Sequence, residues 1–372
     1  MIATPGLGWL TRIVRYALEF CGLALMIVTA AACGNSGGSV AVTQGLWVPN
    51  YHGNTVAEFL SSTRKTSGTP SADLTNSGTD LAGPYGSTFD KSRNLWVSNY
   101  VYGTAGTGSL AEYTLSQLKN LATTPAPSAN VVISGLTGPT GLAFDSSGNL
   151  WVAEYNGNDL LGFTPSQLAA SGSPSPAVTI TSTSFANPIA VKFDKSGDLW
   201  LADGYSTANA TGSTGEVFEF TPSQLSTGGK QTPAVSLATP TLAIPFAIAF
   251  DHSGNLWVAN RSSKTLQEFA ASDLHGTGVI QPAATVTIGA TSVTTSTGTA
   301  NSIDTPSGLA FDGSGNLWVA NGTSDTNGSL AEFSASQLKV SGSPSPKVFL
   351  DSNPSGTNLN FPAQLTFGPS IK

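Results

Sequence analysis

Short apolar runs alternate with polar turns along this chain, and one arrangement of them recurs from end to end. In residues 138–168, GPTGLAFDSSGNLWVAEYNGNDLLGFTPSQL, the run GLAFD predicts an inner strand and DSSGN supplies the residues of a tight turn. LWVAE predicts a second strand, with the aromatic and β-branched residues that a buried sheet favours, and LLGF predicts a third. AVTIT at 177–181 predicts an outer strand. Four strands in a meander are the pattern of one propeller blade.

The central part of this unit is repeated along the chain. Copies read FDKSRNLWVSNY, FDSSGNLWVAEY, FDKSGDLWLADG, FDHSGNLWVANR and FDGSGNLWVANG, and they begin at Phe89, Phe144, Phe193, Phe250 and Phe311. A truncated sixth copy, LWVPNY, begins at Leu46. The tryptophans of the copies are Trp47, Trp96, Trp151, Trp200, Trp257 and Trp318. Their spacing of about 50 to 60 residues is in the range of propeller blades, and we interpret them as structural side chains that fill the space between blades.

The two ends of the chain complete one repeat between them. The first copy starts at its second strand, and FPAQLTFG at 361–368 matches an inner strand that has no strand after it. We therefore predict an all-β, six-bladed β-propeller over residues 45–372, with four-stranded antiparallel blades, closed by a composite blade from both termini. Repeats of this kind form one body, so one domain is expected.

A short helix is predicted between the third and the outer strand of several repeats. A threonine or serine stands three residues before a glutamine at Thr114, Thr164, Thr221 and Ser334. This spacing predicts a capping box, in which each side chain bonds the other residue's backbone. The fifth repeat has Ala270 at the cap position.

Composition narrows the possible partners. Charged residues make up 10% of the 372 residues, the net charge is −7, and lysines and arginines do not cluster. These values argue against nucleic acid as a partner and against electrostatic adhesion to anionic lipid. Cys21 and Cys33 are the only cysteines, so no disulfide is expected in the propeller.

The first 32 residues predict an export signal. Arg12 and Arg15 precede an apolar run over 20–32 that ends in small residues before Cys33. This ending resembles a bacterial lipoprotein cleavage box, which implies a lipid on Cys33. We expect a signal peptide over 1–32, a flexible tether over 33–44 and a lipid-anchored protein of the cell envelope, facing the periplasm or the exterior. An ordinary cleaved signal or an uncleaved anchor stays open, because Ala30 replaces the usual leucine and the run is shorter than the ~20 residues that span a bilayer.

The repeat motif resembles the NHL repeat and a wider group of six-bladed propellers, which includes the gluconolactonase/senescence-marker family and virginiamycin B lyase. The resemblance implies a fold that hosts hydrolases, lyases and binding proteins. For the gluconolactonase group it implies a divalent metal at the channel mouth, held partly by Asn or Asp directly after the proline of the inner strand. The corresponding positions here are Tyr85, Thr140, Ile189, Phe246, Ser307 and Ala363. The lyase group would need a histidine at the mouth, where only His52 is expected.

One polar residue ends each predicted second strand: Asn50, Asn99, Glu154, Asp203, Asn260 and Asn321. If these side chains ring the mouth, then Glu154, Asp203, Asn260 and Asn321 could hold Ca²⁺, which takes carboxylate and amide oxygens. The alternative is that each side chain bonds the backbone of a neighbouring turn. No other cofactor is expected.

Tyrosines gather in the loops of the same predicted face: Tyr51, Tyr85, Tyr100, Tyr102, Tyr155 and Tyr205. Together with Asn50 and Asn99 they have the composition of a ligand-binding surface, although loop packing is the alternative. We therefore expect an exported binding or scaffold module for a glycan, peptide or protein ligand, with no catalytic residues assigned. A metal-dependent hydrolase or lyase of the gluconolactonase type is the alternative.

Overall fold

The computed structural model describes residues 44–101, 106–120, 126–204, 215–295, 298–322, 328–352 and 359–370. The chain divides into two compact units, Met1–Val42 and Thr43–Lys372, and every described element belongs to the second. The predicted signal peptide, the lipidation residue Cys33, and Tyr102 and Tyr205 lie outside the described residues.

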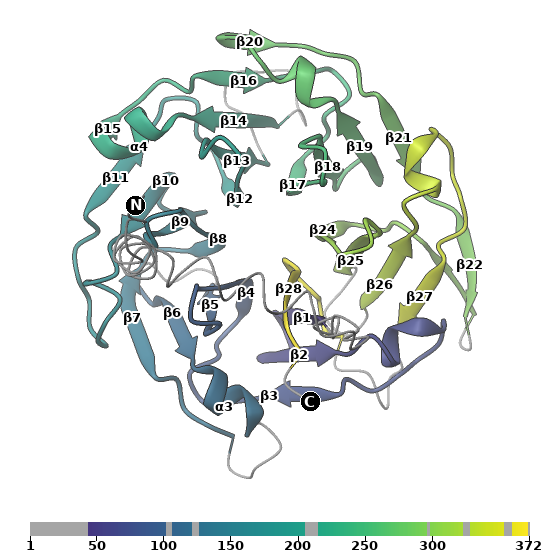
Figure 1. The fold of residues 1–372 in the computed structure, drawn as a ribbon, viewed down its shortest axis with the longest axis horizontal. Helices are drawn as coiled ribbons and strands as arrows, with labels where there is room; N and C mark the ends of the chain where they lie inside the picture. Colours follow the sequence, from purple (N-terminus) through teal and green to yellow (C-terminus); the bar gives the residue numbers. More distant parts are fainter. Residues whose placement is uncertain are drawn as a thin grey trace, which may run out of the picture. The chain divides into compact units, whose positions relative to one another are not determined.

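The second unit is a six-bladed β-propeller, and its blades surround a central axis (Figure 1). We number the blades 1 to 6 from the composite blade. The inner strands are β28 (Thr366–Pro369), β4 (Pro84–Phe89), β8 (Pro139–Phe144), β12 (Pro188–Phe193), β17 (Pro245–Phe250) and β24 (Pro306–Phe311). The second strands are β1 (Gln44–Asn50), β5 (Leu95–Asn99), β9 (Leu150–Glu154), β13 (Leu199–Asp203), β18 (Leu256–Asn260) and β25 (Leu317–Gly322).

The two remaining strands of each blade lie farther from the axis. The third strands are β2 (Thr55–Phe59), β6 (Gly108–Tyr113), β10 (Asp159–Phe163), β14 (Glu216–Phe220), β19 (Thr265–Phe269) and β26 (Gly328–Phe333). The outer strands are β3 (Leu74–Asn76), β7 (Val131–Leu136), β11 (Val178–Thr181), β16 (Val235–Leu237), β21 (Val286–Gly289) and β27 (Val348–Asp351). Two blades gain a fifth, parallel strand: β15 (Gly229–Lys230) beside β11 and β20 (Gly278–Ile280) beside β16. A separate hairpin joins β22 (Ser292–Thr295) to β23 (Gly298–Asn301).

The composite blade closes the ring as the sequence predicts. Strand β28 pairs antiparallel with β1, so that Gln44 lies opposite Pro369 and Trp47 opposite Thr366. An additional bridge joins Asn50 to Pro362. Closure therefore covers the inner edge of the first copy, which would otherwise offer unpaired backbone groups.

The six repeat tryptophans form the core between blades. None is more than 3% exposed, and each joins apolar side chains of the next blade in one cluster. Trp200, for example, clusters with Ile248 and Val258. A buried tryptophan removes 150–250 Å² from water, which stabilises the fold by up to about 4–6 kcal/mol. The structural interpretation of these residues is confirmed.

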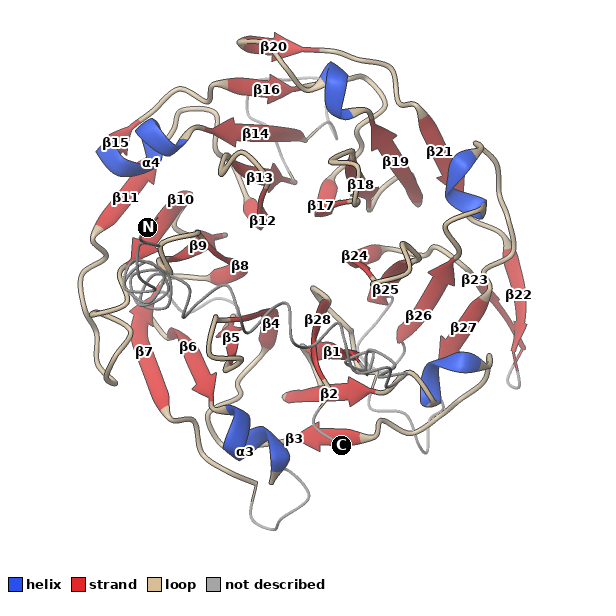
Figure 2. Ribbon diagram, viewed as in Figure 1, coloured by secondary structure: helices blue, strands red, loops and turns tan. Residues whose placement is uncertain are grey.

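Short helical turns connect the third and outer strands (Figure 2). Helices α3 (Leu115–Lys119) and α4 (Pro222–Thr227) begin with the predicted capping boxes of Thr114 with Gln117 and Thr221 with Gln224. Single 3₁₀ turns are η1 (Thr63–Lys65), η2 (Ala271–Asp273) and η3 (Gln337–Lys339).

The prediction of a helix that starts at Thr164 is wrong, because residues 165–168 form a turn. Gln167 Oε1 still accepts a bond from Thr164 N at 2.9 Å. This bond alone does not continue a helix. Within the described part of the chain, no helix is long and apolar enough to cross a membrane.

Candidate functional site

Six aromatic side chains meet at the end of the axis where the inner strands begin. We call this end the mouth and the group the mouth cluster: Tyr51, Tyr85, Tyr100, Tyr155, Phe246 and Phe361. Tyr85 and Phe246 follow the prolines that open β4 and β17, whereas Tyr51, Tyr100 and Tyr155 directly follow the second strands β1, β5 and β9. Residues from five parts of the sequence therefore converge at this end of the ring.

Tyr85 lies at the centre of the mouth cluster. Its ring centroid is 6.0 Å from that of Tyr51, 6.0 Å from that of Tyr100 and 6.3 Å from that of Phe246. Tyr100 in turn meets Tyr155 edge to face at 5.8 Å. Tyr85 and Tyr100 are buried, and the pKa of Tyr85 is raised above its usual range, mainly by burial. The two tyrosines form the floor of the mouth, while Tyr51, Tyr155, Phe246 and Phe361 remain partly exposed.

A cation and an imidazole border the cluster. The guanidinium carbon of Arg261 lies 4.4 Å from the ring centroid of Phe246 and 5.3 Å from that of Phe361, which is cation–π geometry. The exposed His52 meets Tyr51 at 4.7 Å and Phe361 at 5.3 Å. Sequence reasoning missed Arg261, Phe246 and Phe361 as members of the site. Arg261 carried a signal, since it follows the strand-ending Asn260 at the position where three other repeats have tyrosine.

The axis is closed beneath the mouth cluster. The side chain of Gln364, from the composite blade, donates from Nε2 to Ile189 O of blade 4 at 2.8 Å. Blades 1 and 4 lie on opposite sides of the ring (Figure 1), so this bond crosses the axis. Gln364 N also donates to Tyr85 O at 3.0 Å, and Ile189 and Ala363 are fully buried. These contacts place a hydrogen-bonded, buried layer directly beneath the mouth cluster.

The six strand-ending polar residues are all buried, and five of them bond the loop that enters the inner strand of their own blade. Glu154 Oε2 accepts the amides of Thr137 at 2.6 Å and Gly138 at 2.9 Å. Asn50 instead donates to Val48 O at 3.4 Å and to Thr55 Oγ1 at 3.2 Å. Such bonds support the turn-capping interpretation of these side chains.

Two blades differ from the others at this position. The strand-ending asparagine donates to the hydroxyl of its cross-strand partner in four blades: Asn50 to Thr55, Asn99 to Ser109, Asn260 to Thr265 and Asn321 to Ser329. In blades 3 and 4 the register pairs two acids, Glu154 with Asp159 and Asp203 with Glu216.

The acid pair of blade 3 lacks a donor. Within the described structure, the buried Glu154 Oε1 and Asp159 Oδ1 have no hydrogen-bond partner. Burial, reinforced by the charge of Asp159, raises the pKa of Glu154 to about 7 although the two amides favour its charged form.

At two of the six positions where the family resemblance implies metal ligands, a hydroxyl side chain joins neighbouring blades instead. Thr140 Oγ1 donates to Ala153 O at 3.1 Å and Pro188 O at 3.2 Å, and thus bridges blades 3 and 4. Ser307 Oγ makes the same kind of bridge, to Ala320 O and Pro362 O. Tyr85 and Phe246 belong to the mouth cluster, and Ile189 and Ala363 are fully buried.

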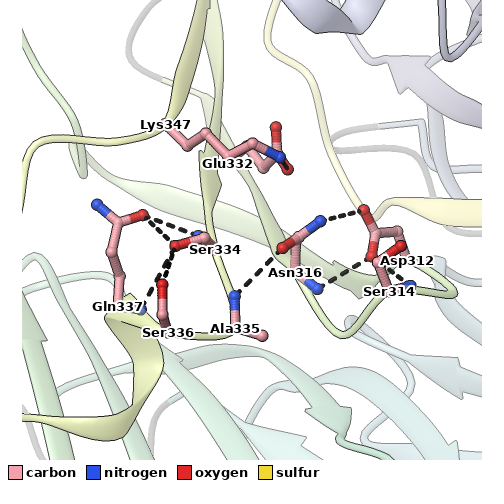
Figure 3. Close-up of polar contacts among 9 residues, drawn as sticks. All are labelled: Asp312, Ser314, Asn316, Glu332, Ser334, Ala335, Ser336, Gln337 and Lys347. Atoms are coloured by element: carbon pink, nitrogen blue, oxygen red, sulfur yellow. Dashed lines mark hydrogen bonds and ion pairs between the residues drawn. The ribbon is translucent and has the colours of Figure 1, made fainter.

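The opposite end of the ring carries the hairpins between inner and second strands. In blade 6, Asp312 accepts the amides of Ser314 and Asn316 and also Asn316 Nδ2 at 2.8 Å (Figure 3). The aspartates that follow the inner strands are thus turn stabilisers, as the sequence indicates. The neighbouring Glu332 is paired with Lys347 at 2.7 Å.

The hairpin of blade 4 departs from this pattern because Asp198 replaces the asparagine. One oxygen each of Asp194, Asp198 and Glu219 lies within 4.8 Å of the others, and this is the one group of three potential metal ligands within the described chain. Trp200 Nε1 donates to Asp194 Oδ2 at 3.2 Å. Burial, with the charges of Asp198 and Asp194, raises the pKa of Glu219 to about 7. Sequence reasoning missed this group, although the FDKSGD variant of the repeat contained the signal.

No protein-family model matches the chain, and no curated protein matches it. Among solved structures, the chain is similar to a protein of unknown function from Bacteroides caccae, with a TM-score of 0.53 and 12% sequence identity over 88% of this chain and 100% of that one. Similarity at this identity is one of fold alone. The fold defines the chain as a six-bladed β-propeller, and its function must be inferred from its own residues.

Proposed function

We propose that this propeller is an exported binding module that recognises a carbohydrate at its mouth. The mouth cluster carries the proposal. Partly exposed rings of Tyr51, Tyr155 and Phe361 offer apolar faces on which the CH groups of a sugar ring can stack, and phenol hydroxyls offer hydrogen bonds. Arg261 and His52 supply further donors at the rim.

The arrangement of the cluster suits recognition because its buried rings support the partly exposed ones. Tyr85 and Tyr100 hold Tyr51 and Tyr155 through ring contacts of about 6 Å. Aromatic side chains fixed in this way lose little conformational entropy on binding. The hydrogen bond of Gln364 across the axis keeps the floor of the mouth closed.

Binding is favoured over metal-dependent hydrolysis or lyase chemistry by the residues at the implied metal positions. Hydroxyl, aromatic and aliphatic side chains stand there, and Thr140 and Ser307 are used to join blades. We retain the relation to NHL-repeat propellers as part of the proposal, on the strength of the motif FD-x-S-x-[ND]-LW, which five repeats share. Calcium-dependent lactone turnover that is lost in Glu154→Gln would support the gluconolactonase-type alternative instead.

The test begins with a glycan and peptide array probed with the purified protein. The captured ligand is then titrated against Tyr51→Ala/Tyr155→Ala, which removes two partly exposed rings and leaves the floor residues Tyr85 and Tyr100. Because an aromatic contact contributes about 0.5–1.5 kcal/mol beyond its buried area, binding is expected to weaken by roughly tenfold or more.

The matched control is Val279→Ala/Val340→Ala, which removes apolar groups that are 66% and 71% exposed. This variant is expected to bind as the parent does. If the array captures peptides but no glycans, the ligand is a peptide and the carbohydrate proposal is wrong. If the tyrosine double variant binds with the affinity of the parent, the mouth is not the binding site.

We also propose export and lipid anchoring, which rest on the apolar run before Cys33. Mass spectrometry of the N-terminal peptide of the native protein should find Cys33 acylated, and Cys33→Ser should move the protein from the detergent phase to the aqueous phase. An unmodified Cys33 in the mature protein would refute the anchor.

A further inference from the structure

A second space lies on the axis at the end opposite the mouth. This axial chamber has a volume of about 300 Å³ and is lined by residues in or next to the inner strands of blades 4, 5, 6 and 1, among them Lys192, Ala249, Leu309, Ala310, Leu365 and Thr366. Phe193, Phe250 and Phe311, which end their strands, and Phe367 of β28 complete the wall. The volume is at the lower end of the range for ligand pockets, which suits a small molecule.

Among the described residues, Lys192 is the one charged side chain that lines the chamber. On the inner strand of blade 4, Lys192 lies opposite Trp200, the repeat tryptophan of the second strand. The other blades have small side chains there: Thr88, Ala143, Ala249, Ala310 and Thr366. The small residues leave the space open, and the lysine places a single ammonium group in it.

The ammonium group of Lys192 has no counter-ion in the described structure. Within the described ranges, no carboxylate lines the chamber, and the side chain of Lys192 makes no hydrogen bond or ion pair. Lys192 is half-buried, and this partial removal from water lowers the pKa of its ammonium group. An unpaired cation among apolar walls is unfavourable, and a bound anion would offset this cost.

The chamber is separate from the mouth. Gln364 crosses the axis between them through its bond to Ile189 O, and Ile189, Ala363 and Leu365 are almost fully buried. The chamber lies on the hairpin side of this bond, so we expect a ligand to enter from the hairpin end. The mouth and the chamber can be occupied or mutated independently.

We propose that the axial chamber binds a small carboxylate with an apolar body, such as a short aliphatic or an aromatic acid. The carboxylate pairs with the Lys192 ammonium group, and the apolar body contacts Ala249, Leu309 and Leu365. One monovalent cation without further charged donors matches a carboxylate better than a phosphate, whose recognition uses several donors. This site is distinct from the carbohydrate site proposed at the mouth.

The experiment is isothermal titration calorimetry of the purified full chain with benzoate and hexanoate, and with the uncharged benzyl alcohol and 1-hexanol. We expect at least one acid to bind, and to bind at least tenfold more tightly than its uncharged counterpart. Lys192→Met keeps the length and apolar surface of the side chain without its charge, and it is expected to weaken acid binding at least tenfold. The control Lys195→Met removes an exposed lysine of the neighbouring hairpin turn and should leave binding unchanged.

Lys192→Gln serves as a second variant if Lys192→Met does not melt cooperatively. Tyr51→Ala/Tyr155→Ala should bind the acid as the parent does, so failure at the chamber and failure at the mouth are distinguishable. The proposal is overturned if neither acid binds, if the acids bind no better than the alcohols, or if the folded Lys192 variant keeps the affinity of the parent.

Discussion

Glu154 and Asp159 face each other in register across the β9–β10 hairpin, where four other blades pair an asparagine with a hydroxyl. The asparagine supplies a donor to its partner, and a glutamate does not. Two buried oxygens of the pair consequently have no bond in the described structure, and burial raises the pKa of both carboxyl groups. A proton, a water molecule or a cation must satisfy them.

The first prediction concerns Glu154→Gln. Because the folded state raises the pKa of Glu154 from 4.5 to about 7, it favours the protonated form, and this contribution to stability is lost as pH rises through about 7. Glutamine does not titrate, keeps an oxygen for the amides of Thr137 and Gly138, and adds a donor for Asp159. Thermal melts should therefore show the variant roughly 2–6 °C more stable than the parent at pH 8, with a smaller difference at pH 5.

The reciprocal change Asn99→Asp removes the donor to Ser109 and should lower the melting temperature at pH 8. A Glu154→Gln variant that melts below the parent at pH 8, with the difference abolished by a chelator, would contradict the prediction. That result would favour the calcium site predicted from the sequence.

At the scale of the element, the hairpins between inner and second strands share one hydrogen-bond network. In blade 5, Asn255 Nδ2 bridges Asp251 Oδ2 and Glu268 Oε1, each at 2.9 Å. Blade 2 has the same bridge through Asn94. In blade 4, Asp198 stands in place of the bridging asparagine. Three carboxylates therefore meet where blades 2 and 5 have a carboxamide between two carboxylates.

The second prediction is that Asp198→Asn restores the bridge. The new carboxamide can donate to Asp194 and Glu219, and loss of one charge removes a cause of the raised pKa of Glu219. The parent loses the stability contributed by Glu219 as pH rises through about 7, whereas the variant should lose less. We expect a melting temperature at pH 8 that is higher by about 1–4 °C, because one charge-assisted hydrogen bond contributes roughly 1.5–3 kcal/mol at most.

Asn255→Asp, which builds the same acidic group in blade 5, is the matched control and should be destabilising. If Asp198→Asn lowers the melting temperature, as Asn255→Asp is expected to do, the prediction is wrong. The carboxylate of Asp198 then stabilises blade 4 in a way that a carboxamide does not.

At the scale of the whole molecule, the ring is held by the pairing of strands from the two ends of the sequence. Strand β28 covers the inner edge of β1, and Leu359 and Leu365 are buried beside it. The third prediction is that deletion of residues 359–372 exposes this edge and removes both leucines from the core. Two buried leucines contribute about 3–6 kcal/mol, so their loss alone should lower the melting temperature by roughly 4–9 °C. The lost strand pairing should lower it further or abolish cooperative unfolding.

Deletion of residues 370–372, which lie beyond β28, is the control and should leave the melting curve unchanged. Calorimetry of the two deletions measures the difference. A protein that lacks 359–372 and melts cooperatively at the temperature of the parent would mean that the composite blade is unnecessary for closure.

Local patterns in the sequence determined the architecture. The repeated GLAFD, DSSGN and LWVAE segments predict strand, turn and strand because side-chain alternation and turn chemistry act over a few residues. The incomplete repeats at the two ends predicted the composite blade, and the capping boxes at Thr114 and Thr221 were predicted for the same local reason. The sequence also indicated the mouth tyrosines by their places in the repeat. Tyr51, Tyr100 and Tyr155 directly follow the second strands, and Tyr85 follows the proline that opens an inner strand.

Only the tertiary structure decided which side chains meet on the axis and which of them remain accessible. Tyr85 meets Phe246, and Gln364 reaches Ile189 over a sequence separation of 175 residues, because ring closure brings inner strands of distant repeats together. Burial of Tyr85 and Tyr100 depends on the sizes of neighbours from other blades, which no single repeat contains. For the same reason Lys192 could not be distinguished by its sequence from a solvated lysine of the repeat. Its isolation follows from the alanine, leucine and threonine side chains that three other blades place around it.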